Sequence, residues 1–176
     1  VLSRSHRPYQ QPPEFRGRFA VKGQSWLDAS VALYDEEILY SDRAIGRLLS
    51  HLRALGLDQT TLVVATADHG EGLMQHGHME HGVHLYEEGV RVPLVFRWKG
   101  ELAAGLTVAE PMSLVDLMPT LVDLIAVPWD GSTDGRSLAA VVRGPPALDP
   151  EAPLLLQQRP PRPARHGRLF LSGEQW

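Results

Sequence analysis

Hydrophobic and polar positions repeat with a helical period over residues 25–55. Acidic and basic residues lie between the apolar ones, and they include the run Asp35, Glu36 and Glu37. Because consecutive side chains diverge around a helix, we expect this run to be a solvated face that carries no chemistry. Gly56 follows the pattern and predicts the end of the helix. The apolar positions are three or four residues apart, as on one helix face: Leu27, Val31, Tyr34, Ile38, Ile45, Leu48, Leu49, Leu52 and Leu55.

Two short apolar runs follow, separated by a polar stretch rich in glycine. Residues 62–66 are mostly β-branched or aliphatic and predict a buried strand. Residues 92–96 predict a second strand, with Pro93 near its start, where proline is tolerated. The repeated glycines between the two runs suit a backbone that passes close to a ligand.

The rest of the chain predicts shorter elements. Residues 1–24 are irregular and rich in proline, with the end of a strand at 1–3. Ser113 predicts the cap of a helix at 114–125, and Pro119 inside that pattern indicates a kink or a late start. The other predicted elements are a turn at 99–105, a strand at 106–108, a short helix ending at Val142, and strand-like pieces at 154–156 and 169–171. We expect two domains: an α/β core at 1–144 and a proline-rich C-terminal segment at 145–176.

Composition excludes several functional classes. The 176 residues contain no cysteine, so they hold no disulfide framework, thiolate metal site or cysteine nucleophile. The net charge of −4 argues against a generic nucleic-acid-binding surface. We expect no membrane span, because no apolar run approaches the required length. The chain begins at Val1 and shows no signal peptide.

Histidines concentrate in the polar stretch that follows the first predicted strand. Five of the eight lie within sixteen residues: His69, His76, His78, His81 and His84. In an open α/β sheet, ligands bind beyond the carboxyl ends of the strands. Asp68 and His69 would lie there, and carboxylate and imidazole are ligands that Zn, Mn, Fe and Ni accept together. A solvated loop can have the same composition, so the residues alone leave both readings open.

Several motifs occur together over most of the chain, and in this order they resemble the C-terminal half of a sulfatase, a family of the alkaline-phosphatase superfamily. The resemblance implies an α/β fold, a mixed sheet flanked by helices, and metal-dependent cleavage of a sulfate ester. Sulfatases are usually much longer, so we expect this chain to be a fragment. The matching pieces are YDEEILYSDRAIGRLLSHLRALGL, ADHGEGL, QHGHMEHG, LYEEGVRVPLVFR, SLVDLMPTLVDLI and DGRSL.

The resemblance implies roles for individual residues near the first strand. Asp68 matches the metal-ligand aspartate, and His69 matches the next position, which is Asn in many sulfatases and His in others. Calcium is the usual metal of the family, whereas an imidazole ligand makes Zn or Mn possible. The lysine that sulfatases often place before the Y-E-E segment is missing here. His81 is therefore our first candidate for the group that contacts the ester, and His84 is our second.

Further residues also receive expected roles, and among them the resemblance supplies that of His6. His6 matches the histidine of an H-x-P-[YF] segment that faces the sulfate ester. Glu71 is expected to orient His69 as a hydrogen-bond acceptor. Arg91 is expected either to bind an anion or to pair with Glu87 or Glu88. The remaining histidines are expected to be loop or surface residues: His51, His76, His78 and His166.

The superfamily's nucleophile segment is not in this sequence, so we expect the isolated chain to turn over no substrate.

Two alternatives to a sulfatase remain open. The Asp-His pair and His81 also fit a phosphoryl or phosphonate ester hydrolase, or a phosphoethanolamine transferase. A non-catalytic structural or binding domain is the alternative from another class. The expected partner is therefore a sulfate- or phosphate-ester substrate, whereas the sequence says nothing of compartment or oligomeric state.

Overall fold

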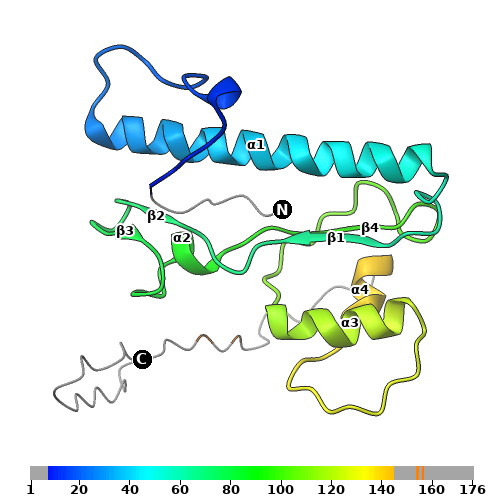
Figure 1. Cartoon of the computed structure of the whole chain (residues 1–176). Helices are drawn as coiled ribbons and strands as arrows, with labels where there is room; N and C mark the ends of the chain where they lie inside the picture. The colour runs from blue at the N-terminus through cyan, green and yellow to red at the C-terminus, as the bar shows by residue number, and fades with distance from the viewer. Residues whose placement is uncertain (1–7, 145–153, 155, 157–176) are drawn as a thin grey trace, which may run out of the picture. The chain divides into compact units, whose positions relative to one another are not determined.

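The computed structural model describes residues 8–144 together with Leu154 and Leu156 (Figure 1). The strands predicted at 1–3 and 169–171 lie outside the described residues, as do His6 and His166. The chain divides into two compact units. The first contains residues 1–47, 67–93 and 156–176, and the second contains residues 48–66 and 94–155. Within the described residues, every helix is too short or too polar to span a bilayer.

The long predicted helix is confirmed as α1, Trp26–Ala54. At its start the Ser25 hydroxyl oxygen accepts a hydrogen bond from the Asp28 N–H at 3.2 Å, which satisfies one of the unpaired donors of the first turn. At its end Gly56 has φ +71°, a left-handed conformation that favours glycine. The Leu57 N–H bonds the Leu52 carbonyl at 2.9 Å, which closes the last turn in a Schellman arrangement.

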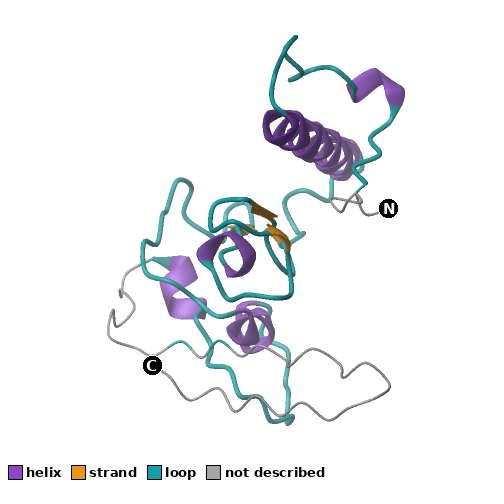
Figure 2. Ribbon diagram, turned by 90° about the vertical axis from the view of Figure 1, so that its left-hand side faces the viewer, coloured by secondary structure: helices purple, strands orange, loops and turns teal. Residues whose placement is uncertain are grey.

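The prediction that Glu36 and Glu37 belong to a solvated helix face was wrong. Their exposed fractions are only 1% and 2%. The segment before α1, which includes the 3-10 helix η1 (Pro13–Phe15), folds back beside the helix and covers them (Figures 1 and 2). Ring contacts hold this segment in place: Tyr9 with Tyr34 at 5.8 Å and Phe15 with Tyr40 at 5.1 Å between centroids.

The buried carboxylates are satisfied by the segment that covers them. Glu36 accepts hydrogen bonds from the Arg18 N–H at 2.7 Å and from the Gln11 side chain. Glu37 accepts one from the Gln10 N–H at 2.8 Å. A buried charge is tolerated only when hydrogen bonds replace its water. These two glutamates therefore anchor the N-terminal segment on the helix, a role that helical periodicity could not reveal.

The first unit also contains a short hairpin and a single helical turn. Strand β2 (Gly72–Leu73) pairs antiparallel with β3 (Met79–Glu80), with Gly72 opposite Glu80. Helix α2 (Glu87–Val90) follows. Together these elements organise the histidine-rich segment.

The second unit is built on β1 (Val63–Thr66) and β4 (Leu94–Arg97), which pair antiparallel with Val63 opposite Arg97. Both strands were predicted, although β1 is half-buried where a buried strand was expected. The strand predicted at 106–108 is absent, and these residues form an irregular connection. Both strand pairs in the described part of the chain are antiparallel.

Two helices complete the second unit. The predicted helix begins late, as a 3-10 turn η2 (Leu114–Asp116) followed by α3 (Leu117–Leu124), with Pro119 in its first turn. Ser113 caps η2 as predicted. Helix α4 (Ala139–Arg143) confirms the expected short helix. One buried cluster contains Leu124, Ala139 and Val142, against which Leu62, Phe96, Trp98 and Leu102 pack.

We predict that Glu36→Ala destabilises the protein by roughly 2–3 kcal/mol, because it leaves the buried donors around Glu36 without an acceptor. The matched control is Asp35→Ala, one residue away and not fully buried, which should cost less than about 0.5 kcal/mol. Urea unfolding of the full-length variants measures both. Equal losses for the two variants would contradict the anchoring role of Glu36.

Candidate functional site

The histidine-rich segment folds tightly because two glycines allow close backbone contact. A Cβ atom at Gly70 would lie 2.1 Å from the Glu88 carbonyl oxygen, and one at Gly72 would lie 2.7 Å from the Glu80 carbonyl oxygen. The Gly70 N–H also donates to the Gly89 carbonyl at 2.8 Å. Any larger residue at these two positions would push the backbone apart. Close packing of the backbone therefore requires the two glycines of D-H-G-E-G, in addition to the polar groups that this segment carries.

Asp68 and His69 lie at the start of this segment. Their side chains approach within 3.8 Å, from Asp68 Oδ1 to His69 Nε2. His69 Nδ1 lies 2.9 Å from the Gly70 carbonyl oxygen, which accepts only from a protonated nitrogen. This hydrogen bond places a proton on Nδ1, and Nε2 is the ring nitrogen that lies 3.8 Å from the carboxylate. Asp68 is 89% exposed, so its carboxylate is accessible to a ligand.

His81 is brought to the same place by the β2–β3 hairpin. The register places Gly72 opposite Glu80, so the preceding Glu71 faces the following His81. Glu71 Oε2 lies 3.1 Å from His81 Nδ1, and the Glu71 side chain is only 3% exposed. The His81 ring also stacks on the His69 ring, with centroids 3.7 Å apart and planes 17° apart. Two residues separated by twelve positions thus become direct neighbours.

Glu71 was expected to orient His69, and the structure corrects this assignment. Its carboxylate bonds His81, whereas the ring of His69 is oriented by the Gly70 carbonyl. The second carboxylate oxygen, Oε1, is buried and has no hydrogen-bond partner among the residues that the structure describes. Burial raises the pKa of the Tyr34 hydroxyl, and the nearby charges of Glu71 and Asp35 raise it further. Glu71 is therefore a buried carboxylate of the hairpin segment whose charge acts on Tyr34 of α1.

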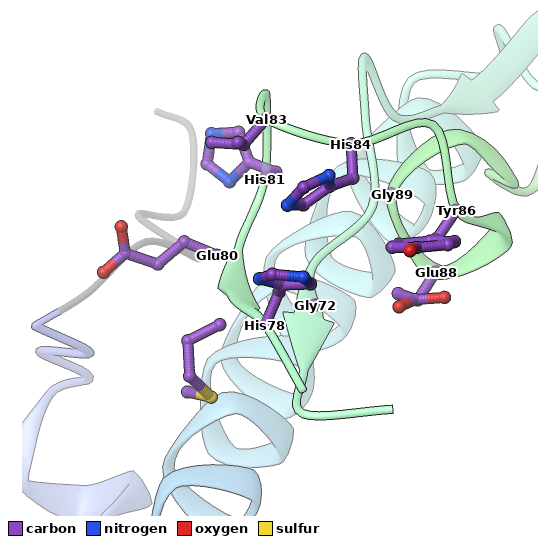
Figure 3. A pocket seen from close by; sticks show the side chains of 10 residues that line it. Gly72, His78, Glu80, His81, Val83, His84, Tyr86, Glu88 and Gly89 are labelled. Carbon is purple, nitrogen blue, oxygen red and sulfur yellow. The ribbon is translucent and has the colours of Figure 1, made fainter. Parts of the chain in front are cut away.

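A pocket of about 80 Å³ opens beside His81 (Figure 3). His78, His84 and Tyr86 present their rings to it, and Glu88 presents a carboxylate. The His78 and His84 rings have centroids 4.0 Å apart. His84, the second candidate for contact with the ester, therefore shares a pocket with His81, the first candidate.

His76 supports this pocket from behind Tyr86. The two rings are nearly parallel, with an angle of 6° and centroids 4.0 Å apart. His76 Nδ1 lies 2.8 Å from Glu88 Oε1. This hydrogen bond holds the pKa of Glu88 below its usual value of 4.5. The contact therefore stabilises the fold above the ordinary glutamate pKa, and this stabilisation disappears as the pH falls through the lowered value.

The remaining candidates have simpler outcomes. Arg91 pairs with Glu87 at 3.7 Å, which is the structural alternative of the two that were expected. His51 is exposed on α1, as expected for a surface residue. Within residues 8–144, no three His, Asp or Glu side chains converge as a complete metal-binding group. Tyr86 was not predicted as a site residue, since an aromatic residue in a loop carries no signal of its own.

We predict that His76→Ala raises the pKa of Glu88 towards 4.5, because the hydrogen bond from His76 is the main cause of its lowered value. A carbon-detected NMR titration of the Glu88 carboxyl group measures this shift. The carboxyl resonance of Glu87, which is exposed and pairs with Arg91, serves as the internal reference. An unchanged Glu88 titration would show that the contact with His76 does not persist in solution.

Known proteins resemble this chain in sequence and in structure. Human arylsulfatase D (Homo sapiens) is 36% identical over 126 residues, which cover 64% of this chain and 21% of the relative. Mouse steryl-sulfatase (Mus musculus) is 38% identical over 125 residues, which cover 63% of this chain and 20% of the relative. The chain thus spans about a fifth of the length of these curated relatives.

Solved structures confirm the expected α/β class with a partial alkaline-phosphatase-like fold. A phosphonate monoester hydrolase from Silicibacter pomeroyi has a TM-score of 0.64 and 31% identity, covering 72% of this chain and 24% of that chain. A second structure, solved with its substrate D-glucosamine-2-N,6-O-disulfate, has a TM-score of 0.62 and 32% identity, covering 67% of this chain and 24% of that chain. The sequence profile of the sulfatase family, whose members generally depend on a metal, matches residues 1–127. This chain belongs to the sulfatase family.

Proposed function

We propose that the full-length protein hydrolyses a sulfate ester and that Asp68, His69 and His81 lie at its reaction centre. The observation that carries this proposal is the stacking of His81 on His69, with His81 held by the buried Glu71. Sulfate-ester cleavage requires that the charge on the non-bridging oxygens be neutralised and that the departing oxygen be stabilised. The carboxylate of Asp68, the two imidazole rings and the buried carboxylate of Glu71, all within one short segment, supply groups of that kind.

Asp68 and His69 fit a divalent cation as two of its ligands. Donor atoms on one ion lie within about 4 Å of each other, the sum of two metal–ligand bonds, and theirs are 3.8 Å apart. A metal-bound histidine commonly donates its other N–H to a backbone carbonyl, as His69 does to Gly70. A bound cation would neutralise charge on the ester oxygens. Calcium is the family's usual ion, and the imidazole of His69 also suits Zn or Mn.

His81 would act on the ester through its Nε2 atom. Because Nδ1 is engaged by Glu71, the ring is held in one orientation and one tautomer. When the ring carries a second proton, as an imidazolium whose Nδ1–H donates to Glu71, its Nε2–H can donate to a non-bridging oxygen or pass that proton to the departing oxygen as the S–O bond breaks, which leaves the neutral ring with its proton on Nδ1. Glu71 does not reach the ester in this proposal and is a positioning residue. His84 and His6 remain further proposed contacts to the ester.

A phosphonate or phosphoryl ester is the second candidate substrate. The observation that favours it is the likeness to the Silicibacter pomeroyi phosphonate monoester hydrolase at 31% identity. Both ester classes present anionic oxygens to the same groups, so the site described above suits either. We propose the sulfate ester first because the matching curated relatives include arylsulfatase D and steryl-sulfatase.

The core at 1–144 and the proline-rich segment at 145–176 are our proposed domain organisation.

We predict that the full-length protein hydrolyses 4-nitrophenyl sulfate at least tenfold more efficiently, in kcat/KM, than 4-nitrophenyl phenylphosphonate. Release of 4-nitrophenol measures both reactions, and chelation of divalent cations should suppress them. A preference for the phosphonate would establish the second candidate. If neither ester is cleaved and Asp68→Ala and His69→Ala leave metal affinity unchanged, the protein is a binding module of another class.

We predict that Glu71→Gln lowers kcat roughly ten- to a hundredfold with little change in KM, because His81 loses the carboxylate that sets its tautomer. Nitrogen NMR of the labelled His81 ring should show a changed tautomer, which a purely structural role would not cause. The matched control is Glu87→Gln, an exposed carboxylate in the same segment. An unaltered tautomer, or an equal effect of the control, would remove Glu71 from the mechanism.

A further inference from the structure

We propose that the pocket formed by His78, His84, Tyr86 and Glu88, here named the ring pocket, binds the alcohol portion of the ester. Its chemistry selects a flat aromatic ring that carries no second negative charge. This inference rests on the proposed function only in placing the ester at His81. It adds a binding site, a class of ligand and a residue that rejects other ligands.

The ring pocket offers a supported aromatic surface. The planes of Tyr86 and His78 differ by 18°, with centroids 6.3 Å apart, so the two rings face nearly the same way. His84 lies 5.4 Å from Tyr86 and stands over His78 in Figure 3. His76 backs Tyr86 at 4.0 Å, which fixes the tyrosine ring before any ligand arrives. Aromatic ligands prefer such offset-stacked surfaces, and a fixed surface loses little entropy on binding.

The ring pocket is continuous with the proposed reaction centre. His81 and Gly72 line the same cavity as His84 and Tyr86. In Figure 3 the His81 ring lies at one end and Tyr86 at the other, with His84 between them. An ester held at His81 would therefore direct its alcohol portion towards the rings. A cavity of about 80 Å³ suits one ring better than a chain of several.

The electrostatic character of the ring pocket comes from Glu88. Its carboxylate lies beside Tyr86 in Figure 3, and its side chain is only 14% exposed. The Glu80 side chain points away from the rings in the same view. A second sulfate or carboxylate on the ligand would approach Glu88 and be repelled, more strongly than in open solvent. A polysulfated sugar is therefore a poor occupant, and an uncharged aromatic ring is a good one.

Three small ligands separate these requirements without any turnover. Phenol is flat and neutral, cyclohexanol has a similar size but no π-system, and 4-hydroxybenzoate is flat with a second charge. NMR of the full-length protein, with labelled histidine rings and at pH 8, reports each titration. We expect phenol to shift the His78 and His84 resonances and to bind at least threefold more tightly than either other ligand.

Variants assign each part of this preference to one residue. Tyr86→Leu should weaken phenol binding roughly three- to tenfold, whereas Tyr86→Phe should keep it. Glu88→Gln should bring the affinity for 4-hydroxybenzoate within about twofold of that for phenol. Glu87→Gln, which changes the neighbouring exposed carboxylate, should leave the discrimination intact.

The outcomes keep this inference separate from the proposed function. Phenol shifts at His78 and His84 in a protein that cleaves no ester would support the ring pocket and reject the hydrolase. Ester cleavage without those shifts would support the hydrolase and reject the ring pocket. Cyclohexanol binding as tightly as phenol would overturn the requirement for a flat ring. Discrimination against 4-hydroxybenzoate that survives Glu88→Gln would overturn the role of Glu88.

Discussion

The candidate site depends on one buried contact, the hydrogen bond between Glu71 and His81. Two short strands with a fixed register bring these residues face to face, and two glycines let the backbone close around them. A carboxylate that has lost most of its water must find a replacement partner, so the pair is kept together by the cost of separating it. The stacking of His81 on His69 then follows, and so does the position of the pocket beside it.

The histidines of this segment divide into groups with different physical roles. His69 and His81 stack together where the ester is proposed to bind. His76 is a supporting residue that bonds Glu88 and backs Tyr86. His78 and His84 form a wall of the adjacent cavity. Five residues of one type therefore do at least three different things, because neighbouring carboxylates and rings decide what each imidazole can do.

The N-terminal segment shows the same principle on α1. Glu36 and Glu37 follow Asp35 in a run of three acidic residues that reads as a solvated surface. Backbone N–H groups of a preceding irregular segment turn two of the three into internal acceptors. A helical wheel shows which residues share a face, but it does not show whether another segment of the chain packs against that face. The sequence therefore predicted the helix correctly but predicted the wrong solvent exposure for Glu36 and Glu37.

The amino-acid sequence by itself determined the longer local elements and the family. Periodicity and end signals located α1, Pro119 indicated the late start of α3, and the ordered motifs identified the sulfatase resemblance, because these depend on neighbours along the chain. Only the tertiary structure decided that Glu71 belongs to His81, that Glu36 is buried, and that Tyr86 lines a pocket. Those facts depend on strand register and on contacts between distant segments, which local sequence preferences do not encode.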